Sequence, residues 1–499
     1  MHDIMEASIE NGLTAYRDRD FNRCSQIFEA CIRRNLRVAE AYYYLGLANL
    51  SGYADYEAAA DCFKKAIQSD PSFVEARSNL AAMQYQLGDT KTAYTNYISL
   101  LEKLPNDKVV LNNTGKLARD YRDYRVAKRC LEHLVSLQPD FVDGLFNLSN
   151  VYTDLGMLNK ALVLLEKIKL ISPQHVKSRA NLGRLYLMMG EWEKGWEDYF
   201  WRVPLLTSHQ YYTDPVTQKD LPLPNQCQLD ISKVRKVAVF ADQGLGDEIF
   251  FLRFVPLLNS KGIFISYLPS AKLAPLLKCS SLPLVLEKQG ATYWQLEPDL
   301  TLAVSDLGWL ANKIGIQPSG APLLFDRAVL QKIDSAKRND SSSRPKIGIT
   351  WRAGDPSKAN SLSKEVALPQ LLQSLKGLDV ELVVLQRNPK IGEVQYIKAN
   401  WENAVIDASK ANDDLCEVAS VLSSLDHYVG VSNTNVHIGA GLQLPTSVLL
   451  PAEGDFRWML GERSTWFPDI PLYRESLSDG WKPALLALRE ELHQQFGRE

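Results

Sequence analysis

The sequence predicts a multidomain protein in which an all-α solenoid of helical repeats is followed by two α/β lobes with parallel sheets. Three observations support this fold class. Prolines recur every 34 residues, a proline-rich polar stretch follows, and short β-branched runs then alternate with helical stretches. We therefore divide the 499 residues into a solenoid (1–202), a linker (203–233), two lobes (234–335 and 336–480) and a C-terminal helix (481–499).

The 34-residue repeat is marked by prolines, alanines and glycines that keep the same register. These positions are Pro71, Pro105, Pro139 and Pro173, then Ala59, Ala93, Ala127 and Ala161, and the turn residues Gly88, Gly156 and Gly190. Two helices in each 34-residue unit form the tetratricopeptide pattern, and we count about six units. Stacked units form a concave groove that binds extended peptides in many proteins. A spacer or a dimerisation element is the alternative.

Composition excludes several classes of protein. A net charge of −3 gives no basic excess for nucleic-acid binding. The seven cysteines are scattered, without a CxxC pair or a Cys/His cluster, so we expect reduced thiols and no zinc site. The acidic start MHDIMEASIENG does not resemble a signal peptide, and no run of 18 apolar residues predicts a membrane span. We therefore expect a cytoplasmic protein.

From Val234 onward the chain alternates short β-branched runs with helices, which indicates parallel sheets covered by helices. The predicted strands are 237–240, 263–268, 284–286, 300–304, 347–351, 382–386, 405–407, 427–431 and 447–450, with helices at 368–375 and 414–425. A polar, Ser-rich break at 331–344 separates two Rossmann-like lobes, and we expect a cleft between them.

Polar and small residues gather where these strands end, on both sides of the expected cleft, which is where ligands bind in such folds. The first lobe supplies "QGLGDE", with Gly244, Gly246 and Asp247. The second lobe supplies Trp351, Arg352, Lys364 and Gln386, followed by Ser432, Asn433, Thr434, Asn435 and His437. We expect a helix to begin near His437, where free N–H groups would bind a phosphate or diphosphate.

Four segments, taken in order after the repeats, resemble a known family. These are "GLGDEIFFLRFVPLL", "IGITWRAG", "DLCEVASVLSSLDHYVGVSNTNVHIGAGL" and "LLPAEGDFRWMLGERSTWFP". Together they resemble bacterial repeat-containing GT-B glycosyltransferases, whose catalytic half is related to heptosyltransferases and whose architecture is similar to that of O-GlcNAc transferases. The resemblance covers nearly the whole chain. It implies a GT-B pair of lobes, with the acceptor in the first lobe and the donor in the second.

The resemblance also implies roles for single residues. Asp247 matches the acid thought to deprotonate the acceptor in heptosyltransferases, Lys364 a basic position facing the donor phosphates, and His437 the histidine of the donor loop. Ser432 and Asn433 stand where heptosyltransferases have Asp-Thr, which leaves the donor open. Structural roles are the alternatives: an N-cap of a helix starting at Ile249 for Asp247, a packed ring for His437 and a solvated side chain for Lys364.

The expected catalytic residue is therefore Asp247, and the expected donor-binding residues are Gly244, Gly246, Trp351, Arg352, Lys364, Gln386, Ser432, Asn433, Thr434, Asn435 and His437. We expect no metal, because a plausible DxD sequence is missing, and no cofactor beyond a nucleotide-sugar co-substrate. GT-B enzymes generally stabilise the leaving diphosphate with helix N-termini and cations. The Gly244-Leu245-Gly246 segment is expected to turn sharply and present Asp247.

The function expected is inverting, metal-independent transfer of a sugar to a protein held in the tetratricopeptide groove, and relatives of this layout suggest flagellin as that protein. One alternative is a catalytically inactive scaffold whose repeats gather partners. Another is an enzyme that glycosylates a lipopolysaccharide or polysaccharide. The lack of a basic amphipathic segment favours a protein acceptor.

Overall fold

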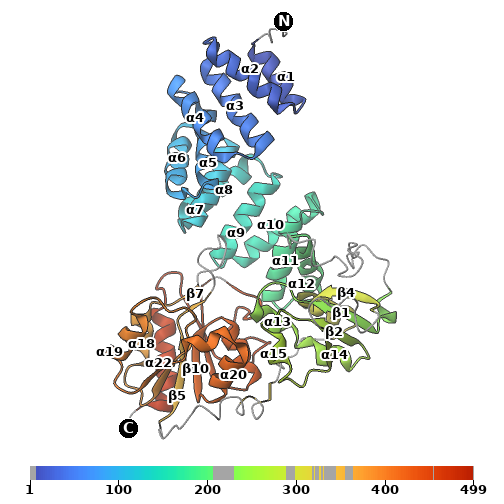
Figure 1. Cartoon of the computed structure of the whole chain (residues 1–499), viewed down its shortest axis with the longest axis vertical. Helices are drawn as coiled ribbons and strands as arrows, with labels where there is room; N and C mark the ends of the chain where they lie inside the picture. Colours follow the sequence, from blue (N-terminus) through green and yellow to red (C-terminus); the bar gives the residue numbers. More distant parts are fainter. Residues whose placement is uncertain are drawn as a thin grey trace. The chain divides into compact units, whose positions relative to one another are not determined.

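The computed structural model describes residues 7–205, 230–287, 298–316, 320, 325–326, 330, 344–353, 364–452 and 454–497. The chain divides into two compact units, Met1–Pro173 and Gln174–Glu499 (Figure 1). Most of the expected linker and most of the polar break expected between the lobes lie outside the described residues.

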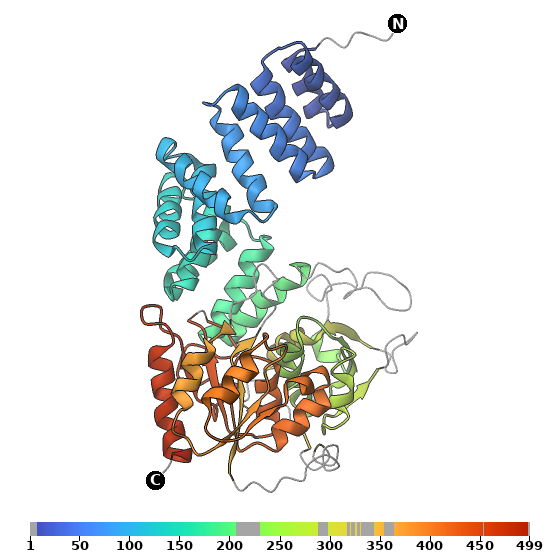
Figure 2. The same ribbon diagram turned by 60° about the vertical axis from the view of Figure 1, so that its left-hand side comes forward.

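The first unit is a stack of helix pairs, as the 34-residue repeat predicts (Figures 1 and 2). Its described helices are α1 (Ile9–Arg17), α2 (Phe21–Arg33), α3 (Val38–Tyr53), α4 (Tyr56–Ser69), α5 (Val74–Gln86), α6 (Thr90–Lys103), α7 (Lys108–Asp120), α8 (Tyr124–Leu137), α9 (Val142–Asp154) and α10 (Leu158–Ile171). The alanines in register are fully buried between the helices. Gly46 is needed for close packing, since a Cβ there would lie 2.7 Å from Cε1 of Phe63.

The turn inside each pair repeats the same local chemistry. The second helix of four pairs begins at an aspartate whose carboxylate accepts a hydrogen bond from a backbone N–H of the first turn: Asp20, Asp55, Asp89 and Asp123. A carboxylate there satisfies a free donor at the positive end of the helix dipole. The residue before the cap takes a left-handed conformation, at Arg19, Ala54, Gly88, Arg122 and Gly156. Glycine adopts that conformation without strain.

The second unit begins with a sixth helix pair among the described residues, α11 (Val176–Met188) and α12 (Trp192–Tyr199), which belongs to this unit and not to the first. Trp196 of α12 is almost fully buried among the rings of Tyr199, Phe251 and Phe254. A side chain at Gly308 would collide with that indole, because its Cβ would lie 2.5 Å from the ring. The last helix pair is therefore part of the core of the α/β region.

Two parallel sheets follow in the same unit. The four-stranded sheet has the order β3-β2-β1-β4, and its strands are β1 (Lys236–Phe240), β2 (Phe264–Leu268), β3 (Leu284–Leu286) and β4 (Leu300–Ala303). The six-stranded sheet has the order β12-β11-β10-β5-β8-β9, and its strands are β5 (Lys346–Thr350), β8 (Glu381–Val384), β9 (Val405–Asp407), β10 (His427–Val431), β11 (Thr446–Leu450) and β12 (Leu472–Arg474). Each predicted strand is confirmed to within two residues at either end, and β12 was not predicted.

Helices cover these sheets, and a short antiparallel pair of β6 (Arg352–Ala353) and β7 (Lys364–Glu365) follows β5. The described helices are α13 (Leu245–Phe251), α14 (Phe254–Asn259), α15 (Ala274–Leu277), α16 (Leu307–Lys313), α18 (Leu368–Leu375), α19 (Glu393–Asn400), α20 (Leu415–Ser423), α21 (Thr434–Gly441) and α22 (Lys482–Phe496). Leucines of α18 and α22 share one core with β5, β8 and β10. The predicted C-terminal helix is thus the outer cover of the second sheet, drawn in red in Figure 2.

Both strand orders contain a point at which the direction of the crossovers reverses. In the first sheet it lies between β1 and β4, and in the second between β5 and β10. The loops that leave the carboxyl ends of these strands diverge there and leave space for a ligand. The expected clusters around Asp247 and Asn433 follow β1 and β10, so they lie at these two points.

A buried charge network ties the last helix pair to the first of these points. Arg202 donates to Asp306 at 2.6 Å, and its guanidinium lies 3.8 Å from the carboxylate of Asp242. Ser305 is hydrogen-bonded to both Arg202 and Asp242. The side chains of both aspartates are fully buried, and burial raises the pKa of Asp242 to about 6 although Arg202 acts to lower it.

Candidate functional site

The two lobes meet where α13, which follows β1, contacts α21, which follows β10. Gly246 of α13 makes the closest approach, since a Cβ there would lie 3.1 Å from Cδ2 of His437 and 3.8 Å from Cα of Thr434. Neither Gly244 nor Gly246 has a positive φ, and the left-handed residue of this turn is Gln243, with a φ of 60°. The chain does turn sharply between Phe240 and Leu245, with Gly244 as the last residue of the turn. Gly246 lies inside α13 and allows close packing between the lobes.

The helix that carries Asp247 starts earlier than predicted. Gly244 is its N-cap and Leu245 its first residue, so the expected start at Ile249 is wrong, and Asp247 is not an N-cap. The carboxylate of Asp247 instead accepts a hydrogen bond of 2.6 Å from Nη1 of Arg457. Arg457 follows β11 in the second lobe. An ion pair thus joins the two lobes at the carboxyl ends of their sheets.

Arg457 is shared between two carboxylates. Its Nε donates to Oδ1 and Oδ2 of Asp455 at 3.0 and 3.2 Å, and its Nη2 donates to Oδ2 at 2.5 Å. Asp455 thus holds both nitrogens while Nη1 reaches Asp247. The side chains of Asp247, Arg457 and Asp455 are 22%, 13% and 14% exposed. This half-enclosed chain of charges, which we call the Arg457 bridge, was missed by sequence reasoning, although "EGDFRW" lies in a segment that carried the resemblance.

The electrostatics of the Arg457 bridge follow from partial burial and close opposite charges. Burial acts to lower the pKa of Arg457, but Asp247 and Asp455 outweigh it and raise that pKa. Burial acts to raise the pKa of Asp455, but Arg457 holds it well below its ordinary value. Arg457 and Asp455 therefore stay ionised over the physiological range of pH.

Lys364 lies beside the bridge on β7. Its Nζ donates to Oγ of Ser432 at 3.4 Å, and Nε1 of Trp458 donates to the same oxygen at 2.9 Å. Burial lowers the pKa of Lys364, and the charge of Arg457 lowers it further. Lys364, Ser432, Asp455 and Trp458 line a cavity of about 10 Å³, which is the space of a single water molecule.

His437 lies on α21 with 3% of its surface exposed and packs against Trp458 and Phe467. Its Nδ1 is buried without a hydrogen-bond partner among the described residues. Burial lowers the pKa of His437 well below its ordinary value, and Arg457 and Arg253 lower it further. The imidazole is therefore neutral near pH 7.

The predicted donor loop forms the start of α21. The helix begins at Thr434, three residues before His437, and Asn433 caps it by accepting a hydrogen bond from the N–H of Val436. The Nδ2 of Asn433 contacts the hydroxyl oxygens of Thr350, the last residue of β5, and of Tyr428 on β10. Asn435 is buried and donates to Asn412.

Trp351, Arg352 and Gln386 form a separate cluster at the end of β5. Oε1 of buried Gln386 accepts hydrogen bonds from the backbone N–H groups of Trp351 and Arg352, at 3.1 and 2.9 Å. The guanidinium of Arg352 pairs with Glu393 at 2.9 Å. These contacts join the ends of β5 and β8, so the structure does not bring this cluster to Asp247 as it brings Lys364, Ser432 and His437.

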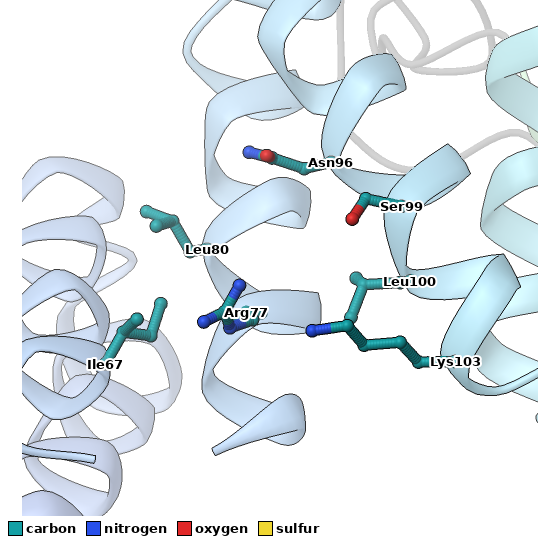
Figure 3. Close-up of a pocket in the computed structure, with 7 residues that line it drawn as sticks. All are labelled: Ile67, Arg77, Leu80, Asn96, Ser99, Leu100 and Lys103. Atoms are coloured by element: carbon teal, nitrogen blue, oxygen red, sulfur yellow. The ribbon is translucent and has the colours of Figure 1, made fainter. Parts of the chain in front are cut away.

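The first unit has a pocket of its own, of about 210 Å³, between α4, α5 and α6 (Figure 3). Its lining consists of Ile67, Arg77, Leu80, Asn96, Ser99, Leu100 and Lys103. Arg77 donates to the backbone carbonyl of Pro71 at 2.5 Å. The lining contains two cationic side chains, Arg77 and Lys103, and three aliphatic ones. This combination would suit a ligand that carries both a carboxylate and apolar groups.

The sequence predicts neither a metal site nor a membrane span. No cluster of three or more His, Cys, Asp or Glu side chains in the described residues is arranged to hold a metal ion. Every described helix is too short or too polar to cross a bilayer.

Comparison with known proteins identifies the type of repeat in the first part of the chain. The tetratricopeptide repeat family matches residues 54–101. The chain is 23% identical over 471 residues to Protein FlbA of Caulobacter vibrioides, covering 86% of this chain and 74% of that protein. It is 25% identical over 178 residues to human Protein O-mannosyl-transferase TMTC3, covering 35% of this chain and 20% of that protein. The first part of the chain is thus a stack of tetratricopeptide repeats.

Two solved structures resemble part of the chain. MamA (41-end) from Desulfovibrio magneticus aligns with a TM-score of 0.30 and 18% identity, over 34% of this chain and 92% of that one. A tetratricopeptide repeat protein from Parabacteroides merdae aligns with a TM-score of 0.35 and 17% identity, over 39% and 77%.

Proposed function

We propose that this protein is a GT-B glycosyltransferase that transfers a sugar from a nucleotide-sugar donor to a polypeptide bound by the repeats. The observation that carries the proposal is the juxtaposition of Asp247, Lys364 and neutral His437 where the two sheets meet. A carboxylate from one lobe opposite cations from the other lobe suits a reaction that removes a proton on one side and expels a phosphate on the other. The name of the human relative, an O-mannosyl-transferase with which a third of the chain aligns, supports the same class.

In the proposed reaction the acceptor hydroxyl gives its proton to the carboxylate of Asp247 while its oxygen forms a bond to the anomeric carbon of the donor sugar. The bond from that carbon to the phosphate oxygen breaks, and the electron pair leaves with the nucleotide diphosphate. Attack opposite the leaving group inverts the anomeric centre. Lys364 and the N-terminus of α21 would stabilise the leaving anion without a metal ion.

The repeats would hold the acceptor. The pocket between α4, α5 and α6, whose lining includes Arg77 and Lys103, would take an acidic residue of an extended polypeptide. Flagellin stays our suggestion for that polypeptide, on the strength of the family resemblance alone. Candidate acceptor proteins should bind the parent protein and its Ser99→Ala variant equally well. They should lose binding to the variant in which Arg77 and Lys103 are both changed to Ser.

A transfer assay with a panel of nucleotide sugars tests the proposal. Thermal shifts with free nucleotides first select the base, because a bound ligand raises the melting temperature according to its affinity. The Asp247→Asn variant should then bind donor at least as well as the parent does and lose about 10²–10⁴-fold in transfer rate, the usual contribution of a general base. Near-parental transfer by a folded Asp247→Asn protein would place the base elsewhere, and EDTA-sensitive activity restored by Mg²⁺ or Mn²⁺ would exclude the metal-free mechanism.

A catalytically inactive scaffold is the second candidate, and one observation favours it. The cavity beside Lys364 has room for one water molecule only, and the expected base is already paired with Arg457. An inactive protein would show no thermal shift with any nucleotide diphosphate at millimolar concentration, while its repeats would still capture a partner.

A further inference from the structure

Arg457 lies where a donor's diphosphate would have to be neutralised, yet its Nη1 is occupied by Asp247. The guanidinium has two firm hydrogen bonds through Nε and Nη2 to Asp455, which belongs to the same short segment of the second lobe. Its contact with Asp247 crosses to the other lobe, over 210 residues of sequence. The anchored side of Arg457 therefore keeps its place when the crossing contact breaks.

The local charges explain why the crossing contact would break when an anion enters. The formal charges of Asp247, Asp455, Arg457 and Lys364 sum to zero, and His437 is neutral because burial lowers its pKa. A diphosphate adds at least two negative charges beside Lys364, and an arginine pairs with phosphate oxygens at least as well as with a carboxylate. Asp247 and the anion would then compete for one Nη1 group.

We propose that Arg457 exchanges partners: it holds Asp247 while the cleft is empty, and it turns its Nη1 to the donor's diphosphate when the donor binds, which releases the Asp247 carboxylate. Arg457 is thus a binding residue for the anion and a positioning residue for the base. The exchange makes the base available only after the donor is bound. This inference rests on the proposed function, but its anion-binding half stands without sugar transfer.

Binding of inorganic pyrophosphate by isothermal titration calorimetry tests the exchange in a double-mutant cycle. Arg457→Gln should weaken pyrophosphate binding about 10- to 100-fold, as expected for a lost charge-assisted hydrogen bond. Asp247→Asn should tighten binding about 3- to 10-fold, because Arg457 is then free before the anion arrives. The exchange predicts that this gain disappears when Arg457→Gln is already present.

The cycle separates exchange from simple repulsion. If Asp247 acted only by its negative charge, Asp247→Asn would tighten binding equally in the parent protein and in the Arg457→Gln variant, and that result would overturn the proposal. So would the absence of pyrophosphate binding in the Asp247→Asn protein. Arg457→Lys gives a second background that keeps the charge but lacks the fork of three nitrogens, and the gain should shrink there too. Exposed Arg463, which donates to the carbonyl of Pro468, gives the matched control Arg463→Gln, which should leave affinity unchanged.

Two readouts keep this inference apart from the proposed function. Coupling between Asp247 and Arg457 without any sugar transfer would support the exchange and count against the glycosyltransferase. Transfer activity with equal gains in both backgrounds would support the enzyme and overturn the exchange. Melting temperatures of each variant establish that the compared proteins are folded.

Discussion

Two arginines of the second unit each lie between two aspartates, and they do so in different surroundings. Arg202 joins Asp242 and Asp306, whose side chains are 0% exposed, while Arg457 joins Asp247 and Asp455, whose side chains are 22% and 14% exposed. Asp242 and Asp247 both follow β1, five residues apart in sequence. The same strand end therefore supplies one carboxylate to the core and another to the cleft.

The two networks differ in how far their charged groups can still contact solvent or a ligand. In the Arg202 network the hydroxyl of Ser305 bridges Arg202 and Asp242, and all three side chains are buried. These groups therefore hold the core together. In the Arg457 bridge the carboxylates retain access to solvent, and Nδ1 of His437 beside them has no hydrogen-bond partner in the described part of the chain. A fully buried pair is costly to break and offers little to a ligand, whereas a pair that keeps some contact with solvent can exchange partners.

The largest expected effect on stability is at the buried network. Arg202→Met should lower the free energy of unfolding by about 3–5 kcal/mol, because two buried carboxylates lose the guanidinium that neutralises them. Urea denaturation followed by fluorescence measures it. A loss below about 1 kcal/mol would mean that the two networks do not differ as burial predicts.

The pH dependence of stability should also separate the networks. Asp242 in the folded protein keeps its proton up to a pKa of about 6, against 3.8 for an ordinary aspartate. The folded state thus binds more protons between these values, and stability falls as the pH rises through them, by up to about 3 kcal/mol.

Asp242→Asn should flatten this slope in urea titrations between about pH 4 and 7. Asp455 provides the contrast, because its pKa is lowered: its contribution to stability is present above pH 3.8 and is lost only in stronger acid. Asp455→Asn should therefore leave the slope above about pH 4 unchanged. A steeper slope in Asp242→Asn would contradict the assignment.

Removal of Arg457 should lower the free energy of unfolding by less than removal of Arg202 does. Arg457→Met should lower the free energy of unfolding by about 1–2 kcal/mol, because Asp247 and Asp455 can recover part of their hydration. The same urea protocol compares it directly with Arg202→Met. Equal losses in the two variants would show that the Arg457 bridge is a structural element like the buried network.

The smallest expected effect concerns the contact between α13 and α21. Gly246→Ala places a methyl group 3.1 Å from His437, whose ring is packed and has little room to move. We expect a net loss of about 1 kcal/mol, since crowding outweighs the gain in helix propensity. Gly244→Ala is the control, because its Cβ would meet Asp247 only at 3.4 Å. A more stable Gly246→Ala protein would indicate that the lobes separate easily.

Sequence predicted the repeats and the strands well, because both depend on local patterns. The fixed spacing of prolines and alanines indicates the repeats, and short β-branched runs indicate the strands. Both signals lie within short stretches of the sequence. The partner of Asp247 lies 210 residues away, and nothing near either residue indicates the pair. Asp242 and Asp247 look alike in sequence for the same reason: only the positions of Ser305, Arg202 and Arg457 in space decide which of them is buried. Gly246 was recognised as important, but its reason, the ring of His437, belongs to another lobe.

The burial of Trp196 against Gly308 and the aromatic residues after β1 has a consequence for how such a chain can be inherited. Repeat units ahead of Pro173 contact their neighbours in one common way, so gene segments coding for 34 residues could be duplicated or deleted there without redesign. The pair α11–α12 is different, because its tryptophan packs against Gly308 and two phenylalanine rings of the α/β region. We therefore expect lineages to vary in the length of the array while passing on this last pair and the α/β region as a single inherited module.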